Sequence, residues 1–156
     1  MNSLTENFLI IDGKEEWSVK IYCDRKILTG QIDELSSEAA LLEKQIMSSS
    51  PGKAFLLKRK KTDFIEIEMD RFCKDKGQDY YIRFRDLSES NNLNNLLPKE
   101  LTGREDTMIL NATFLVNKLR VNEFKDAADN LQKKDANSGF FVEINGPWPP
   151  FSFISI

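Results

Sequence analysis

The sequence contains no histidine, and only Cys23 and Cys73 among its 156 residues are cysteines. Histidine is the most frequent general base near neutral pH and the most frequent nitrogen ligand of metal ions, so its absence excludes the usual acid–base and metal-centred active sites. A serine or cysteine nucleophile would have no imidazole to activate it, and two cysteines so far apart in the chain do not have the spacing of a zinc site. The sequence also lacks the P-loop and the glycine-rich dinucleotide motif. We therefore expect a protein without enzymatic activity, metal or cofactor.

Neither sign of charge dominates, and long apolar runs are missing. There are 22 basic and 25 acidic residues, which give a net charge of −3 and a pI near 5.2; this balance argues against a nucleic-acid partner. No stretch approaches the ~20 apolar residues that cross a bilayer, and the first residues lack the basic and apolar segments of a signal peptide. We expect a cytoplasmic protein with reduced thiols that binds neither nucleic acid nor a membrane.

What the sequence does contain is an ordinary globular composition with many phenylalanines. Hydrophobic residues make up 40% of the chain, charged residues make up 30%, and Phe occurs 11 times, which is enough for a sizeable core. The length fits a single domain best. We therefore interpret residues 1–156 as one domain and residues 1–15 as its linker or tail.

Alternation of apolar and polar residues predicts three strands, over residues 16–24, 107–117 and 140–145. The second of these carries apolar side chains on both faces, so we expect it to lie centrally in a sheet. A shorter strand is expected at residues 92–97, where Pro98 ends it or confines it to a sheet edge.

Apolar residues at steps of three and four predict three helices, over residues 25–47, 53–87 and 120–134. Gly77 falls inside the second helix, where glycine costs about 1 kcal/mol relative to alanine, so a kink or break is expected there. The polar segment 88–95 after this helix is predicted to be a loop.

The predicted order is strand, long helical excursion, strand, strand, helix, strand. This is the β-α-β-β-α-β pattern of a ferredoxin-like fold, an α+β sandwich with helices on one face of an antiparallel sheet. The helical connection after the first strand is larger than this fold needs.

The chain ends on the stiff aromatic stretch "INGPWPPFSF". Pro147 and Pro150 have the spacing of a polyproline segment that a partner protein recognises. The structural interpretation is that Gly146 lets the chain leave the last strand, the prolines fix its path, and Trp148 covers apolar surface. We favour the structural interpretation and predict that Trp148 is substantially buried.

Two further patterns have simpler explanations than a binding site. "SGFFVEI" is similar to the aromatic strand of an RNA-recognition motif, but it falls on the fourth strand instead of the third, and the acidic pI disfavours RNA. The basic run "KRKK" at residues 58–61 is followed by acidic residues that can pair with it along a helix face, so we interpret it as a solvated surface.

Four stretches in the same order together point to a known family: "EWSVKIYCD", "SSSPGKAFLLKRK", "TGREDTMILNATFLV" and "FVEINGPWPPFSF". They resemble the C-terminal domain of the gas vesicle protein family GvpL/GvpF over about residues 16–153. Phe55, Phe114 and Phe151 stand where that family usually has tyrosine. The family-motif residues, which are also our candidates for partner binding, are Trp17, Lys20, Pro51, Gly52, Phe55, Asn111, Phe114, Gly146, Pro147, Trp148, Pro149, Pro150, Phe151 and Phe153.

The resemblance implies an accessory or minor structural protein of gas vesicles, the gas-filled protein shells that give some prokaryotes buoyancy. Its partners would be the small hydrophobic shell protein GvpA, whose aggregation it would limit before assembly, and other gas vesicle accessory proteins. Family members usually carry a further N-terminal α/β domain, which we expect to be missing because only about fifteen residues precede the first strand. The alternative from a different class is a stand-alone ferredoxin-like ligand-binding or regulatory module.

Overall fold

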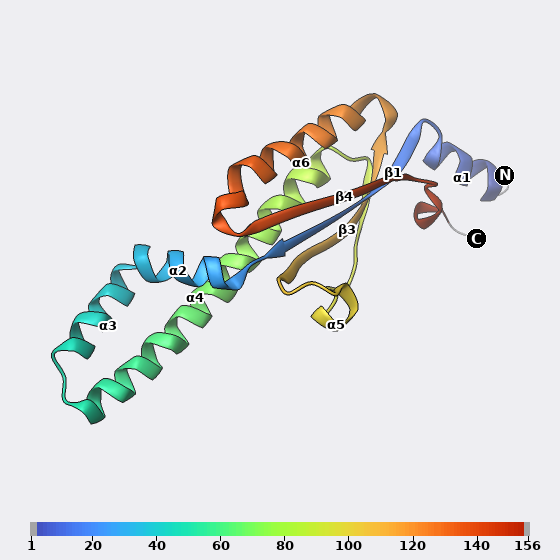
Figure 1. Ribbon diagram of the computed structural model, residues 1–156. Coiled ribbons are helices and arrows are strands. Elements are labelled where there is room, and N and C mark those ends of the chain that lie inside the picture. Colours follow the sequence, from blue (N-terminus) through green and yellow to red (C-terminus); the bar gives the residue numbers. More distant parts are fainter. Residues whose placement is uncertain (1–2, 155–156) are drawn as a thin grey trace.

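The computed structural model describes residues 3–154, which form an elongated molecule of helices around one antiparallel sheet (Figure 1). Three short 3₁₀ segments, η1 to η3, join or follow the longer elements. The helices and strands are α1 (Ser3–Ile11), β1 (Lys14–Cys23), α2 (Arg25–Leu35), α3 (Ser37–Met47), α4 (Pro51–Asp86), β2 (Ser90–Leu93), α5 (Lys99–Thr102), β3 (Thr107–Asn117), α6 (Val121–Asp135) and β4 (Phe140–Trp148).

The four strands lie in the order β2-β3-β1-β4, and every neighbouring pair is antiparallel. This is the order of a ferredoxin-like sheet, so the α+β prediction is confirmed. β3 is central, as its apolar content indicated, and so is β1; the two strands pair from Lys14 opposite Asn117 to Cys23 opposite Thr107. The two outer strands are β2, which is short and polar, and β4, which carries the proline. Both properties suit sheet edges.

The core lies between the sheet and the helices α4 and α6 and is built on aromatic rings. Phe84 of α4, Phe114 of β3 and Phe124 of α6 are fully buried. Their ring centroids are 5.1 to 5.8 Å apart with tilted planes, a spacing at which aromatic pairs attract beyond their burial of apolar area. Trp17 of β1 joins the cluster, with its ring 6.5 Å from that of Phe124.

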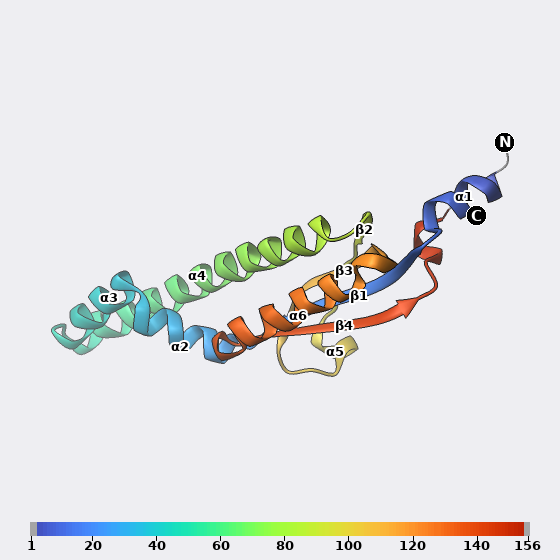
Figure 2. The same cartoon turned by 90° about the horizontal axis from the view of Figure 1, so that it is seen from above.

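α4 is much longer than the sheet that it covers. Its 36 residues span about 54 Å at 1.5 Å per residue. Its C-terminal part packs on β3, and its N-terminal part continues beyond the sheet with α3 beside it (Figure 2). We call α2, α3 and the first part of α4, residues 25–70, the arm. No helix in residues 3–154 combines the length and the apolar character needed to cross a bilayer.

The structure corrects two helix predictions. The expected single helix 25–47 is broken at Ser36, whose extended backbone ends α2 and whose hydroxyl accepts the N–H of Ala39 to begin α3. Gly77 does not kink α4. A Cβ at Gly77 would lie 2.8 Å from the carbonyl oxygen of Ile109, so this glycine is needed for close contact between α4 and β3.

Strand boundaries also differ from those predicted. The short edge strand is residues 90–93 and not 92–97, because its backbone, within the expected loop 88–95, pairs with β3. β4 continues to Trp148 instead of ending at residue 145. The expected linker, residues 1–15, contains α1 and the first residues of β1.

The prediction that Trp148 is buried is wrong: 51% of its surface is exposed. β4 stays paired with β1 up to Trp148, which lies opposite Glu16 at the sheet edge. Trp17 is the buried tryptophan at this end of the sheet. Its indole lies so close to Gly146 that a Cβ at this position would be only 2.7 Å from the ring. Gly146 is therefore required for this close approach as well as for its backbone angle, φ +155°.

Candidate functional site

The sequence motifs separate into two groups at opposite ends of the molecule. Trp17, Phe114 and Gly146 come together at the end of the sheet near α1 and η3 (Figure 1). Trp17 and Phe114 are neighbours across β1 and β3, and both are buried. Trp17 and Phe114 therefore hold the fold together and offer a partner almost no surface, whereas Gly146 is exposed.

Lys20 and Asn111 lie opposite each other on β1 and β3, on the face of the sheet away from the core. The Asn111 side-chain amide donates to the carbonyl oxygen of Asn95 at 2.9 Å. This bond anchors the connection between β2 and α5 on the sheet. Asn111 therefore has a structural partner inside the chain.

The C-terminal motif is tied to the sheet but partly exposed. The backbone N–H of Ser152 donates to the Glu16 carboxylate at 3.3 Å, which holds η3 (Phe151–Phe153) near the start of β1. Trp148 and Phe151 are both more than half exposed, whereas Phe153 is half-buried. The C-terminal motif thus fixes the end of the chain to β1 and also exposes some apolar surface.

The motif "SSSPGKAFLLKRK" lies at the tip of the arm. Pro51 is the first residue of α4, a position that proline favours because its missing N–H has no helical partner there. Gly52 and Phe55 follow within the first turns, and Phe55 is 67% exposed. Within α4, burial begins only at Ile65.

Local capping and one lysine fix the shape of the arm. Asp24 begins α2 by accepting the backbone N–H groups of Lys26 and Ile27. Lys61 of α4 donates to Asp33 of α2 at 2.8 Å and to Glu43 of α3 at 2.9 Å. These hydrogen bonds, that to Asp33 first, raise the pKa of Lys61, and they connect all three helices through one ammonium group.

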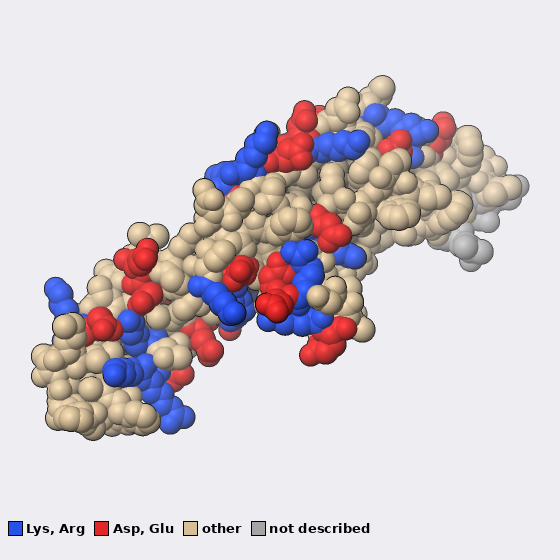
Figure 3. Space-filling view, viewed as in Figure 1, with Lys and Arg blue, Asp and Glu red and all other residues tan. Residues whose placement is uncertain are grey.

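The arm carries six large apolar side chains that are each more than half exposed. We call this set the arm surface. Its members are Leu35, Leu41, Met47, Phe55, Leu56 and Ile67. In the space-filling view the tip of the arm, at lower left, is uncharged surface with Lys and Arg side chains beside it (Figure 3). Large exposed apolar groups bordered by charge are typical of protein–protein contact sites.

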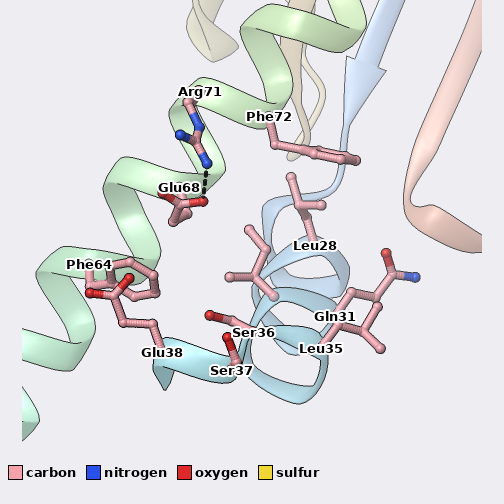
Figure 4. A pocket seen from close by; sticks show the side chains of 11 residues that line it. Leu28, Gln31, Leu35, Ser36, Ser37, Glu38, Phe64, Glu68, Arg71 and Phe72 are labelled. Carbon is pink, nitrogen blue, oxygen red and sulfur yellow. Dashed lines mark hydrogen bonds and ion pairs between the residues drawn. The ribbon is translucent and has the colours of Figure 1, made fainter. Parts of the chain in front are cut away.

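A cleft of about 560 Å³ opens at the base of the arm, between α4 and the junction of α2 with α3. Figure 4 shows Phe72 from α4 facing Leu28 from α2, and Phe64 from α4 and Leu35 at the end of α2 also line the cleft. Some of the polar groups on its rim are already engaged within the chain. Glu68 accepts from Arg71 at 2.6 Å, and the Ser36 hydroxyl caps α3.

The cleft brings hydroxyl groups and carboxylates together with apolar side chains. The chain has no histidine, so the commonest base for a serine nucleophile is missing. Among residues 3–154 no three Cys, Asp or Glu side chains come together as metal ligands. What the arm does offer is shaped apolar surface.

Sequence reasoning found only part of the arm surface. Phe55 was a candidate through its motif, but Leu41, Leu56 and Ile67 were not. These three residues lie off the apolar stripes that predicted the helices. Apolar residues that lie outside the apolar stripe of a predicted helix are thus the sequence feature that indicates exposed apolar surface. Leu35 lay on the stripe and is nevertheless 84% exposed, because α2 ends there.

Comparison with known proteins gives consistent results. The model of the family described as "Gas vesicle synthesis protein GvpL/GvpF" matches residues 2–155. Gas vesicle protein L from Streptomyces sp. (strain CB03234) is 25% identical over 146 residues, which are 94% of this chain and 50% of that protein. The chain therefore spans about half the length of this curated relative.

Two crystal structures share the fold. The gas vesicle protein GvpF from Anabaena sp. PCC7120 superposes with a TM-score of 0.67 at 20% identity, covering 98% of this chain and 59% of that one. GvpF from Microcystis aeruginosa gives a TM-score of 0.59 at 19% identity with the same coverage. At these identities the likeness concerns the fold alone.

Proposed function

Because the chain belongs to the GvpL/GvpF family of gas vesicle synthesis proteins, we propose that it assists gas vesicle assembly by binding the shell protein GvpA and limiting its aggregation. The observation that carries this proposal is the arm surface. It places six large apolar side chains on helices that extend beyond the sheet. A non-catalytic accessory role in the cytoplasm, at the growing vesicle, follows from the same proposal.

A binding partner for the arm surface must itself be strongly apolar. Exposed leucine, methionine and phenylalanine side chains gain free energy when they leave water, about 25 cal/mol for each Å² of apolar area buried. An apolar shell subunit would supply the complementary area and would lose its own tendency to aggregate. Phe55 and Leu56 adjoin the basic run 58–61, whose charges keep the arm soluble and would border the contact.

The alternative, a stand-alone ligand-binding module, would need convergent polar groups free to hold a small molecule. In the arm cleft Glu68 and Arg71 pair with each other, and the Ser36 hydroxyl is used in capping. The described cleft therefore favours an apolar partner over a polar ligand.

The proposal is tested by diluting denatured GvpA into buffer with and without this protein and following light scattering. We expect the wild-type chain to suppress scattering and the double variant Phe55→Ser with Leu56→Ser to suppress it several-fold less. Leu119→Ser is the matched control, since Leu119 is also exposed but lies in the 3₁₀ segment η1 (Lys118–Arg120), outside the arm. If wild type gives no suppression, or if all three proteins suppress equally, the arm is not the binding surface.

A further inference from the structure

The two cysteines of the chain meet inside the protein. Cys23 is the last residue of β1, and Cys73 lies in the middle of α4. Both are buried and both are free thiols, with their Sγ atoms 3.6 Å apart. A disulfide bond is about 2.05 Å long, so the two sulfur atoms need to approach by only about 1.5 Å to bond.

The surroundings make the two thiols unequal. The hydrogen bond shared with Cys23, together with the nearby Arg25 guanidinium, lowers the pKa of Cys73 against the opposing effect of burial. The same hydrogen bond and burial raise the pKa of Cys23. Arg25 is held in place by Asp70, whose carboxylate accepts from it at 2.8 Å. The lowered pKa favours a thiolate on Cys73, and Cys73 is also the one of the two thiols that lines a cavity; we therefore assign it the attacking role.

Cys73 can be reached by a small molecule. It lines a cavity of about 500 Å³ between α4 and β3, together with Gly77, Tyr81, Leu96 and Met108. The walls of this cavity are mainly apolar. It has room for a small uncharged oxidant such as hydrogen peroxide. Its two charged lining residues, Asp70 and Lys74, have opposite signs, so they form no cationic cluster that would hold a large anionic disulfide such as oxidised glutathione.

We propose that Cys23 and Cys73 are a dithiol oxidation site at which a peroxide forms an intramolecular disulfide. The Cys73 thiolate attacks one peroxide oxygen, the O–O bond breaks, and the products are a sulfenic acid and hydroxide, which takes up a proton to become water. Cys23 then attacks the Cys73 sulfur, the S–O bond breaks, and a second water leaves. Two thiols are oxidised and one peroxide is reduced, and a dithiol reductant reverses the step.

The position of the pair gives this disulfide a specific structural effect. The segment between Cys23 and Cys73 contains α2, α3 and the first part of α4, which is the whole arm. Oxidation therefore closes a covalent loop at the base of the arm and fixes α4 to the end of β1. Loss of chain entropy in the unfolded state then raises the melting temperature.

The first test uses the wild-type protein and hydrogen peroxide. We expect the intact mass to fall by about 2 Da, the two hydrogens lost on disulfide formation. The thiol count in denaturant should fall to zero, the melting temperature should rise, and dithiothreitol should reverse all three. Two persisting thiols, a covalent dimer, or a mass gain from sulfinic acids would each overturn the proposal.

Single variants test the order of the two steps. Cys23→Ser should leave a Cys73 sulfenic acid that dimedone labels, whereas Cys73→Ser should leave Cys23 labelled at least several-fold less. Equal labelling of both variants, or stronger labelling of Cys23, would overturn the assigned roles. This inference does not rest on the proposed function, because no shell protein takes part in these measurements.

Discussion

The sheet half of the molecule and the arm are built from similar helices but bury very different amounts of apolar surface. In the sheet half, Phe84, Phe114 and Phe124 are fully enclosed. In the arm, burial is limited to a thin layer between the helices, and six large apolar side chains face outward. The sheet half has an enclosed aromatic core that the arm lacks, although it also exposes large apolar side chains, among them Leu96, Leu101 and Leu119.

This difference separates stability from binding within one chain. The aromatic rings at the centre of the core come from α4, β3 and α6. The arm adds only Leu28 of α2 and Met69 of α4 to the buried core cluster. The arm is held by capping and by the Lys61 ion pairs, which are worth little individually at a surface. Substitutions in the two regions should therefore affect different measurements.

The largest expected effect is from Phe124→Ala. Phe124 contacts the rings of Trp17, Phe84 and Phe114, so its loss should lower the free energy of unfolding by about 3–5 kcal/mol. Denaturant titration measures this. Phe55→Ala in the arm is the matched control and should change stability by no more than about 0.5 kcal/mol, as exposed sites do. Similar losses for both variants would remove the distinction between the two regions.

Next in size is a contrast between two helical glycines. Gly77→Ala brings a Cβ to within 2.8 Å of the Ile109 carbonyl, and we expect it to destabilise the fold by about 1–3 kcal/mol. Gly30 in α2 has nothing within 4 Å of its Cβ position, so Gly30→Ala should stabilise the protein by roughly 0.5–1 kcal/mol. Thermal melts of the two variants should shift in opposite directions. Shifts of the same sign would mean that α4 does not contact β3 as described.

A small stability effect is expected for Trp148→Ala, in contrast to Trp17→Ala at the same end of the sheet. Trp148 is 51% exposed, so Trp148→Ala should destabilise the fold by no more than about 1.5 kcal/mol. Trp17 is buried against Gly146 and Phe124, and Trp17→Ala should destabilise it by about 3–5 kcal/mol. Chemical denaturation of both variants under one set of conditions makes the comparison. A larger loss for Trp148→Ala would restore the original structural interpretation of the C-terminal stretch.

The sequence predicted the strand order and the helix-covered sheet because the periodicity of β1, β3 and β4 was plain. It did not predict the break at Ser36, because a serine that ends one helix and caps the next is locally no different from a serine on a helix surface. It predicted that Trp148 is buried, and this is wrong because β4 stays paired with β1 along the sheet edge as far as Trp148. It also did not predict why α4 contains Gly77, because the close contact that requires a glycine there is with β3, a strand distant in sequence.

The candidate site was only partly predictable for a related reason. A motif identified Phe55, but the exposure of Leu41, Leu56 and Ile67 depends on how α3 packs beside α4. Sequence periodicity shows which residues share a helix face. It does not show how far a helix extends beyond the sheet that would otherwise cover it.

Site-specific photocrosslinking to GvpA tests the division between the two regions most directly. A photoreactive phenylalanine analogue at position 56 lies on the arm surface, and the same analogue at position 148 lies at the opposite, terminal end of the sheet. We predict a crosslinked product with GvpA from position 56 and none above background from position 148. A product from position 148 but not from position 56 would contradict the account and assign binding to the end of the sheet.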